Sequence, residues 1–132
     1  MKLSAKNPDI IDAKLTFSAL NERKKLLNLY EADDHDLFDF FGLGMSPNFH
    51  VNFKYLISLD GTQAAWGRVP WILFSNSLLI KDDTTKEQWF YPLFKDKENV
   101  MMVDPNNLDS LFEIYQWCED NQDEVKTMIE NA

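Results

Sequence analysis

Residues 53–61, FKYLISLDG, are the stretch of sequence that decides the fold. This run of apolar and aromatic residues lacks strict alternation and closes on Asp60 and Gly61, a pattern typical of a strand buried on both faces of a parallel sheet. Residues 64–74 can form a helix if it begins late or is kinked at Pro70. Residues 77–80, SLLI, then predict a second buried strand, closed by charged residues. Strand, helix and strand within about thirty residues form a βαβ unit, so the sequence predicts an α/β fold with an open parallel sheet.

Shorter elements are expected on either side of this unit. Residues 100–103, VMMV, predict a third strand, and residues 108–117 and 125–129 have the apolar spacing of amphipathic helices. Upstream, residues 9–16 are apolar enough for a short strand, and residues 18–30 carry the apolar stripe of a helix. We therefore expect the 132 residues to form a single domain with a helical C-terminal end.

Composition excludes several classes of protein. Hydrophobic residues make up 45% of the chain, which is enough for a core, and 22 acidic against 13 basic residues give a formal net charge of −9. That charge works against binding to nucleic acid or anionic membranes. No apolar run approaches the roughly 20 residues that span a bilayer, and the N-terminus lacks the apolar core of a secretory signal. With a single cysteine and no zinc-ligand spacing, the sequence predicts a soluble, cytoplasmic protein without a metal.

The turn after the first strand is the candidate ligand site. Ligands of open parallel sheets bind beyond the carboxyl ends of the strands. A helix beginning near Ala64 would direct its free N–H groups and positive dipole end there, which suits a diphosphate. Arg68, one turn into that helix, would add a cation able to bind two phosphate oxygens. The alternative is an ordinary turn at Asp60 and Gly61 with Arg68 on the surface. Spacing alone favours this alternative, because the glycine-rich dinucleotide fingerprint is missing.

The four tryptophans are a second group of candidates, because an indole ring can stack on a sugar or a uracil. Trp66 could take that role or a structural one. We expect Trp71, Trp89 and Trp117 to pack in the core, as tryptophans usually do.

Several linked motifs resemble the signature of family 90 glycosyltransferases, which includes capsule-associated, lipopolysaccharide and protein O-glucosyltransferase-like proteins. The motifs are KYLISLDG at residues 54–61, WGR at residues 66–68 and SNSLLIK at residues 75–81. The likeness continues through residues 87–93 and 108–132 and is weaker before residue 53. Several motifs in the same order are far more specific than any one of them.

The resemblance implies a GT-B transferase whose C-terminal, Rossmann-like half holds the sugar nucleotide, and the chain resembles that half. It implies a catalytic role for Arg68, which would stabilise the diphosphate leaving group as negative charge grows on it. Trp66 stands where many members carry a serine, and Glu87 would accept hydrogen bonds from ribose hydroxyls. The donor-binding residues that the resemblance implies are Asp60, Gly61, Asn76, Ser77, Lys81 and Glu87, and the stacking argument adds Trp66.

We therefore expect the donor-binding part of a glycosyltransferase that needs no metal or other cofactor. The enzyme would move a hexose or pentose from a nucleotide diphosphate sugar, UDP first among them, to a hydroxyl of a lipopolysaccharide or capsule-type acceptor. The family's acceptor-binding half, which carries the general base, is absent from this chain, so we expect a fragment or a split protein that transfers no sugar alone. The alternative is a non-catalytic interaction module that keeps the fold and binds a protein through its open face.

Overall fold

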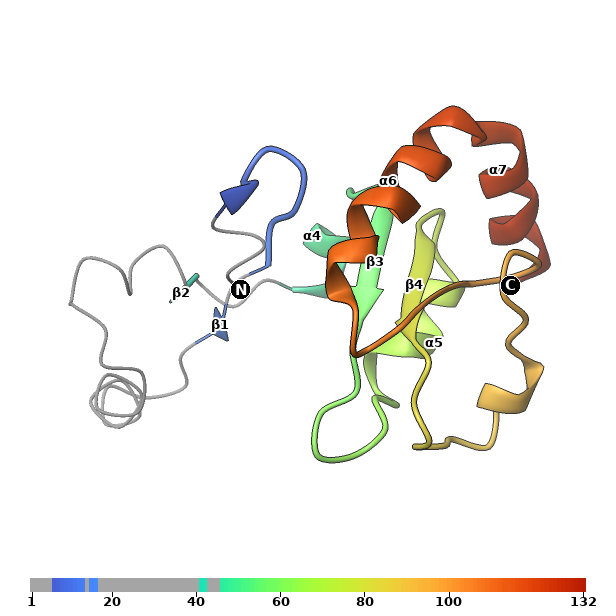
Figure 1. Ribbon diagram of the computed structural model, residues 1–132. Helices are drawn as coiled ribbons and strands as arrows, with labels where there is room; N and C mark the ends of the chain where they lie inside the picture. Colours follow the sequence, from blue (N-terminus) through green and yellow to red (C-terminus); the bar gives the residue numbers. More distant parts are fainter. Residues whose placement is uncertain (1–5, 14, 17–40, 43–45) are drawn as a thin grey trace. The chain divides into compact units, whose positions relative to one another are not determined.

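The computed structural model describes residues 6–13, 15–16, 41–42 and 46–132. The chain divides into two compact units, Met1–Met45 and Ser46–Ala132, and each is described by itself. In the first unit, β1 (Leu15–Thr16) pairs in parallel with β2 (Phe41–Gly42) (Figure 1). Among the described residues of the strand predicted over residues 9–16, residues 15–16 form a strand and residues 9–10 belong to a turn. The helix predicted over residues 18–30 lies outside the described residues, and the single domain stays a prediction.

The second unit is built on a three-stranded parallel sheet with the strand order β3-β4-β5. Its strands are β3 (Tyr55–Ser58), β4 (Leu78–Asp82) and β5 (Met101–Val103). Tyr55 lies opposite Leu78, and Ile80 lies opposite Met101. The α/β class, the parallel sheet and its three strands are confirmed, while the GT-B arrangement stays a prediction.

Helix α5 (Arg68–Leu73) connects β3 to β4. It begins four residues later than the expected start near Ala64, so Arg68 is its first residue and does not lie one turn inside it. Pro70 explains the late start. Proline has no N–H to donate and is tolerated in the first turn of a helix, where N–H groups lack intrahelical partners, but not deeper.

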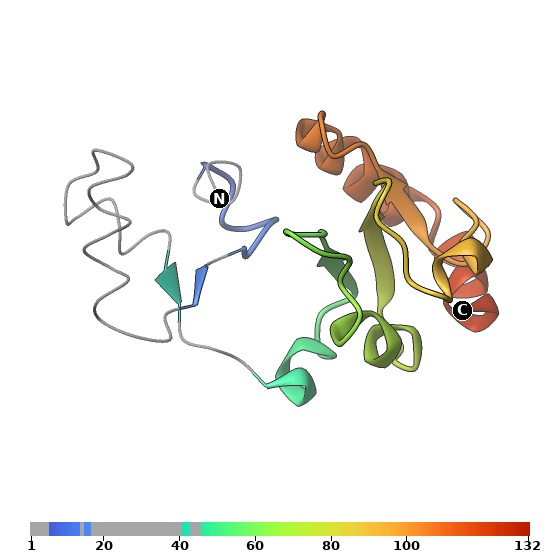
Figure 2. The same cartoon turned by 90° about the horizontal axis from the view of Figure 1, so that it is seen from below.

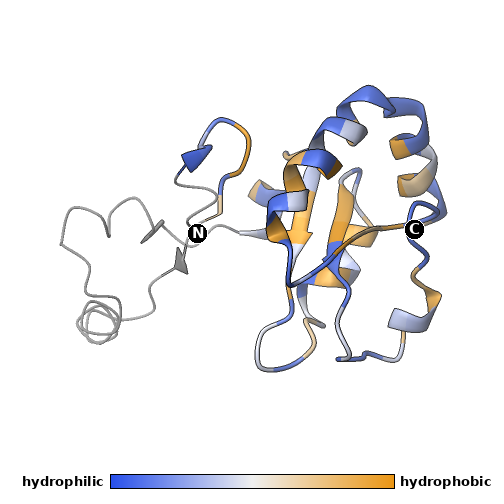
Figure 3. Ribbon diagram, viewed as in Figure 1, coloured by the Kyte–Doolittle hydropathy of each residue, from blue (hydrophilic) through white to orange (hydrophobic). Residues whose placement is uncertain are grey.

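Helices cover both faces of the sheet (Figures 1 and 2). On one face, Val69 and Ile72 of α5 pack with Leu56, Leu79 and Val100 in the main apolar cluster. On the other face lie α6 (Leu111–Asp120) and α7 (Gln122–Asn131). The apolar colouring of Figure 3 gathers on the sheet and on the helix sides turned toward it. The sheet is therefore the middle layer, as parallel strands require.

The two faces of β3 are not equally buried. Its residues alternate between half-buried and buried, with Leu56 and Ser58 directed toward the α5 side. Tyr55 faces the other side, where its ring packs edge-on against Tyr115 at 6.1 Å and its hydroxyl donates to Glu119 at 2.6 Å. β4, the central strand, is buried at every residue. The expectation of complete burial thus fails for the edge strand β3 and holds for β4.

Three short helices complete the second unit: α4 (Pro47–His50), η1 (Tyr91–Leu93) and η2 (Leu108–Ser110). In the part of the chain that the structure describes, no helix is long and apolar enough to cross a membrane. The cytoplasmic location stays a prediction.

Candidate functional site

A buried group of charged side chains lies where β3 and β4 end. Because the two strands are parallel, Asp60, which follows β3, comes close to Lys81 and Asp82 at the end of β4. The Lys81 ammonium lies 3.0 Å from Asp60 Oδ2 and also binds the Asp82 carboxylate. The side chains of Lys81 and Asp60 are 1% and 0% exposed. The expectation that Lys81 and Asp82 close the strand as charged end residues is wrong, because their mutual pairing lets the strand continue through both.

Asp60 is the centre of this group. Its carboxylate accepts hydrogen bonds from the Ala65 amide at 2.8 Å, from Thr84 Oγ1 at 2.6 Å and from the Tyr91 hydroxyl at 3.1 Å. Its own amide donates to both carboxylate oxygens of Asp82, at 3.0 and 2.9 Å. Burial raises the pKa of Asp60, but the hydrogen bonds from Thr84, Ala65 and Lys81 and the Lys81 charge outweigh it and hold the pKa below its ordinary value of 3.8. Asp60 therefore shapes the turn as an ionised, fully bonded side chain.

The lowered pKa of Asp60 predicts a loss of stability in acid. The folded state binds fewer protons than the unfolded chain, so the contribution is complete above the ordinary pKa of 3.8 and is lost as the pH falls through the lower, folded-state value. We expect the free energy of unfolding to fall between about pH 5 and about pH 2, and to fall less steeply in Asp60→Asn. Urea unfolding at stepped pH measures both slopes. Equal slopes would show that other carboxyl groups carry the acid sensitivity.

Arg68 closes the loop that follows β3. Its Nε donates to Ser58 Oγ at 2.8 Å, and its Nη2 donates to the Leu59 carbonyl oxygen. Ser58 is fully buried, whereas Arg68 is exposed. Within residues 46–132, no acceptor is bound to Nη1, so this nitrogen is available to an anion. The guanidinium is thus fixed along one edge and open to solvent along another.

The turn beside Arg68 is open on its outer side. The Lys86 ammonium binds the Gly61 carbonyl oxygen and brings a second cation to this edge of the sheet. A Cβ built on Gly61 would meet nothing within 4 Å, so the fold itself does not require glycine there. Trp66, in the same loop, is 70% exposed. Asp60, Gly61, Trp66, Arg68 and Lys81 are therefore brought to one edge of the sheet.

Asn76 and Ser77 are not part of this group, whereas Glu87 follows Lys86 on the segment that leaves the end of β4. Asn76 and Ser77 precede β4 and lie at the opposite, amino edge of the sheet, where Ser77 Oγ donates to the Phe53 carbonyl oxygen at 2.7 Å. Glu87 is exposed on the segment between β4 and η1. The structure gives Ser77 a structural partner and places it away from Arg68.

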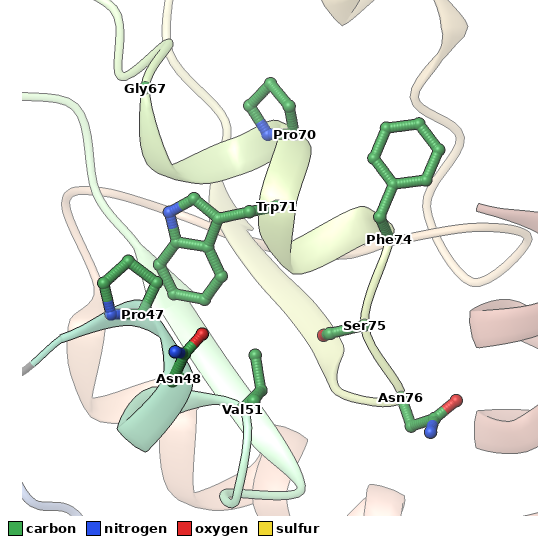
Figure 4. Close-up of a pocket in the computed structure, with 9 residues that line it drawn as sticks. All are labelled: Pro47, Asn48, Val51, Gly67, Pro70, Trp71, Phe74, Ser75 and Asn76. Atoms are coloured by element: carbon green, nitrogen blue, oxygen red, sulfur yellow. The ribbon is translucent and has the colours of Figure 1, made fainter.

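An open groove of about 640 Å³ runs between α4 and α5 (Figure 4). Pro47, Val51, Pro70, Trp71 and Phe74 form most of its lining, and Asn76 lies at one end. Phe74 is 93% exposed, whereas Trp71 is half-buried and stacks on His50 at 5.9 Å. This apolar groove offers no cation to a phosphate.

Several residues at the carboxyl edge of the sheet, where β3 and β4 end, were not identified from the sequence. Ser58, Thr84 and Tyr91 were not singled out, although Thr84 directly follows the end of β4 and its charged residues, which was the available signal. Burial and the nearby Asp60 charge raise the pKa of Tyr91, so it stays a neutral hydrogen-bond donor. Trp89 was expected in the core and is 85% exposed, because its neighbours Phe90 and Tyr91 take the inward positions.

Comparison with known proteins agrees with the motifs. The profile of Glycosyl transferase family 90 matches residues 1–132. Protein O-glucosyltransferase 3 of Homo sapiens is 30% identical over 133 residues, which cover 100% of this chain and 24% of the human protein. The mouse protein of the same name, from Mus musculus, is 30% identical over 131 residues, with 98% and 23% covered. The chain spans about a quarter of the length of these curated relatives.

Proposed function

The chain belongs to glycosyltransferase family 90, and we propose that its carboxyl edge binds the nucleotide diphosphate sugar of a glycosyl transfer reaction. The observation that carries the proposal is Arg68, whose guanidinium is fixed by Ser58 and Leu59 and leaves Nη1 open at the end of β3. Ligands of open parallel α/β sheets bind at this edge.

The chemistry of the leaving group fits this arrangement. When the glycosidic bond to a nucleotide diphosphate breaks, negative charge grows on the terminal phosphate oxygens. A cation already held in place stabilises that charge without reorganising, so its effect is larger in the transition state than in the ground state. Nη1 and the second hydrogen of Nη2 form the free edge of the Arg68 guanidinium, which suits two phosphate oxygens, and Lys86 adds a second positive charge beside Gly61.

The names of the relatives support a proposal for the sugar and the acceptor. Their name, protein O-glucosyltransferase 3, favours glucose as the transferred sugar and a protein hydroxyl as the acceptor. The lipopolysaccharide or capsule-type acceptor expected from the motifs is the other outcome of an acceptor screen. For the donor nucleotide we propose UDP, bound without a divalent metal ion.

The test is a calorimetric titration of the 132-residue chain with UDP-glucose, UDP and UMP, with and without magnesium. We expect UDP and UDP-glucose to bind without metal and more tightly than UMP, which lacks the second phosphate. Gly61→Ala should fold as well as the parent chain, because the added methyl meets no atom, and should bind UDP more weakly if the diphosphate lies against the turn. No binding at millimolar UDP, or binding only with magnesium, would contradict the proposal.

A non-catalytic interaction module is the second candidate, and exposed apolar side chains favour it. Phe74 is 93% exposed and Leu93 is 64% exposed, and the groove between α4 and α5 is lined mainly by apolar residues. Such a surface suits a protein partner. The two candidates differ in the same titration, because an interaction module has no reason to distinguish UDP from UMP.

A further inference from the structure

The loop between β3 and α5 is held at its ends and in its middle. We call residues 59–68 the donor loop. Arg68 ties its two ends together through Ser58 and Leu59. Its middle is tied at Ala65, whose amide donates to Asp60 and whose carbonyl lies 2.8 Å from the Tyr91 hydroxyl. A loop held at both places has little freedom to move Arg68.

Tyr91 reaches this loop from a distant part of the chain. Its hydroxyl lies 3.1 Å from Asp60 Oδ1 as well as 2.8 Å from the Ala65 carbonyl oxygen, so one phenolic proton is shared between two loop residues. The ring itself is fixed, because it stacks on Phe94 at 5.2 Å and packs edge-on against Phe90 at 5.2 Å. The Tyr91 side chain is thus held by its ring contacts and connects η1 to the middle of the donor loop.

Lys81 also stabilises the donor loop, through its ion pair with Asp60. An ammonium group has three donors, and those of Lys81 face Asp60 Oδ2, the Asp82 carboxylate and the Asp82 carbonyl oxygen. Its side chain is 1% exposed, and the Tyr91 ring centroid lies 5.0 Å from its Nζ. Lys81 is enclosed by these groups, so it acts on the loop through Asp60 and does not reach a ligand.

We propose that Tyr91 is a positioning residue, which acts with the Lys81–Asp60 pair to hold the donor loop so that Arg68 meets the diphosphate already oriented. This inference rests on the proposed function and adds to it. A group that is placed before the ligand arrives loses less freedom on binding, so the loop contacts contribute to affinity without touching the ligand. Lys81, which the resemblance implies as a donor-binding residue, thus stabilises the donor loop and does not contact the donor.

The experiment compares two tyrosines that lose the same atom. Tyr91→Phe removes the hydroxyl that contacts the donor loop, and Tyr55→Phe removes the hydroxyl of a similarly half-buried tyrosine that binds Glu119 on the other face of the sheet. Both should cost some stability, since each loses a hydrogen bond. We expect only Tyr91→Phe to weaken UDP binding, by about 3- to 10-fold, and only Tyr91→Phe to speed hydrogen exchange at the Ala65 amide.

The outcomes distinguish a failure of the positioning role of Tyr91 from a failure of the proposed function. If the parent chain binds UDP and Tyr91→Phe binds it equally well, the positioning role is wrong and the proposed function stands. If Tyr55→Phe weakens UDP binding as much as Tyr91→Phe, the loss reflects stability alone and the positioning role is again wrong. If the parent chain shows no preference of UDP over UMP, the proposed function fails and this inference fails with it. Unchanged exchange at Ala65 in Tyr91→Phe would also overturn the inference, independently of any ligand.

Discussion

Lys81→Met should lower the free energy of unfolding of the chain by about 3–5 kcal/mol, the usual cost of removing one partner from a buried ion pair. Methionine keeps the length and apolar stem of lysine but leaves the carboxylates of Asp60 and Asp82 buried without a cation. Both are almost fully enclosed, with Asp60 at 0% and Asp82 at 4% side-chain exposure. Their mutual repulsion, which Lys81 cancels, adds to the cost of burying each charge.

Urea unfolding followed by circular dichroism measures this loss. Lys95→Met is the matched control, because Lys95 also pairs with a carboxylate, Glu98 at 3.2 Å, but both side chains are about two-thirds exposed. It should stay within about 0.5 kcal/mol of the parent chain. Adding Asp82→Asn to Lys81→Met should recover part of the loss, because it removes one of the two unpaired charges. A loss below about 1 kcal/mol in Lys81→Met would show that water reaches these carboxylates.

The sheet could be predicted from the sequence because each strand is marked by a local run of apolar residues. Continuous apolar runs at residues 53–59 and 77–80, separated by a length that fits one helix, are enough to indicate a parallel βαβ unit. The start of α5 was harder to predict. The sequence left two possibilities at Pro70, a late start or a kink, and the hydrogen bond from the Ala65 amide to Asp60 shows that residues 64–67 form a loop and that the helix starts late.

The polar group at the carboxyl edge could be predicted only in part. Asp60 and Arg68 were expected there, because they flank the turn after the first strand. The burial of Lys81 was not predictable, because the sequence Lys81-Asp82-Asp83 has the local pattern of an exposed strand end. Its burial depends on Asp60, which follows another strand, and on Tyr91, 31 residues from Asp60 along the chain. Contacts over such separations leave no periodic signal in one sequence.

The contacts of Arg68 bear on folding as well as on ligand binding. A side chain directed only into a solvated cleft would contribute little to folding. Arg68 instead donates to Ser58 Oγ, which is fully buried. We therefore expect Arg68→Ala to lower the free energy of unfolding by about 1 kcal/mol, the usual contribution of one hydrogen bond. The effect on ligand binding should be larger than this effect on folding.

Arg68→Ala should weaken UDP binding by about 1.5–3 kcal/mol, or roughly 10- to 150-fold, as the loss of a hydrogen bond to a charged group does. Arg68→Lys should restore part of the affinity, because it returns the charge without the planar fork. Arg68→Ala should also lose the preference for UDP over UMP, since that preference depends on the contact of Arg68 with the second phosphate. Lys95→Met again serves as the control for a surface cation away from the site.

The most direct test of the account is therefore the ratio of UDP to UMP affinity, measured by calorimetry in the parent chain and in Arg68→Ala. The account predicts a ratio well above one in the parent chain, which falls close to one in Arg68→Ala and to an intermediate value in Arg68→Lys. A ratio that Arg68→Ala leaves unchanged would contradict the account, because the diphosphate would then bind somewhere other than the carboxyl edge of β3 and β4.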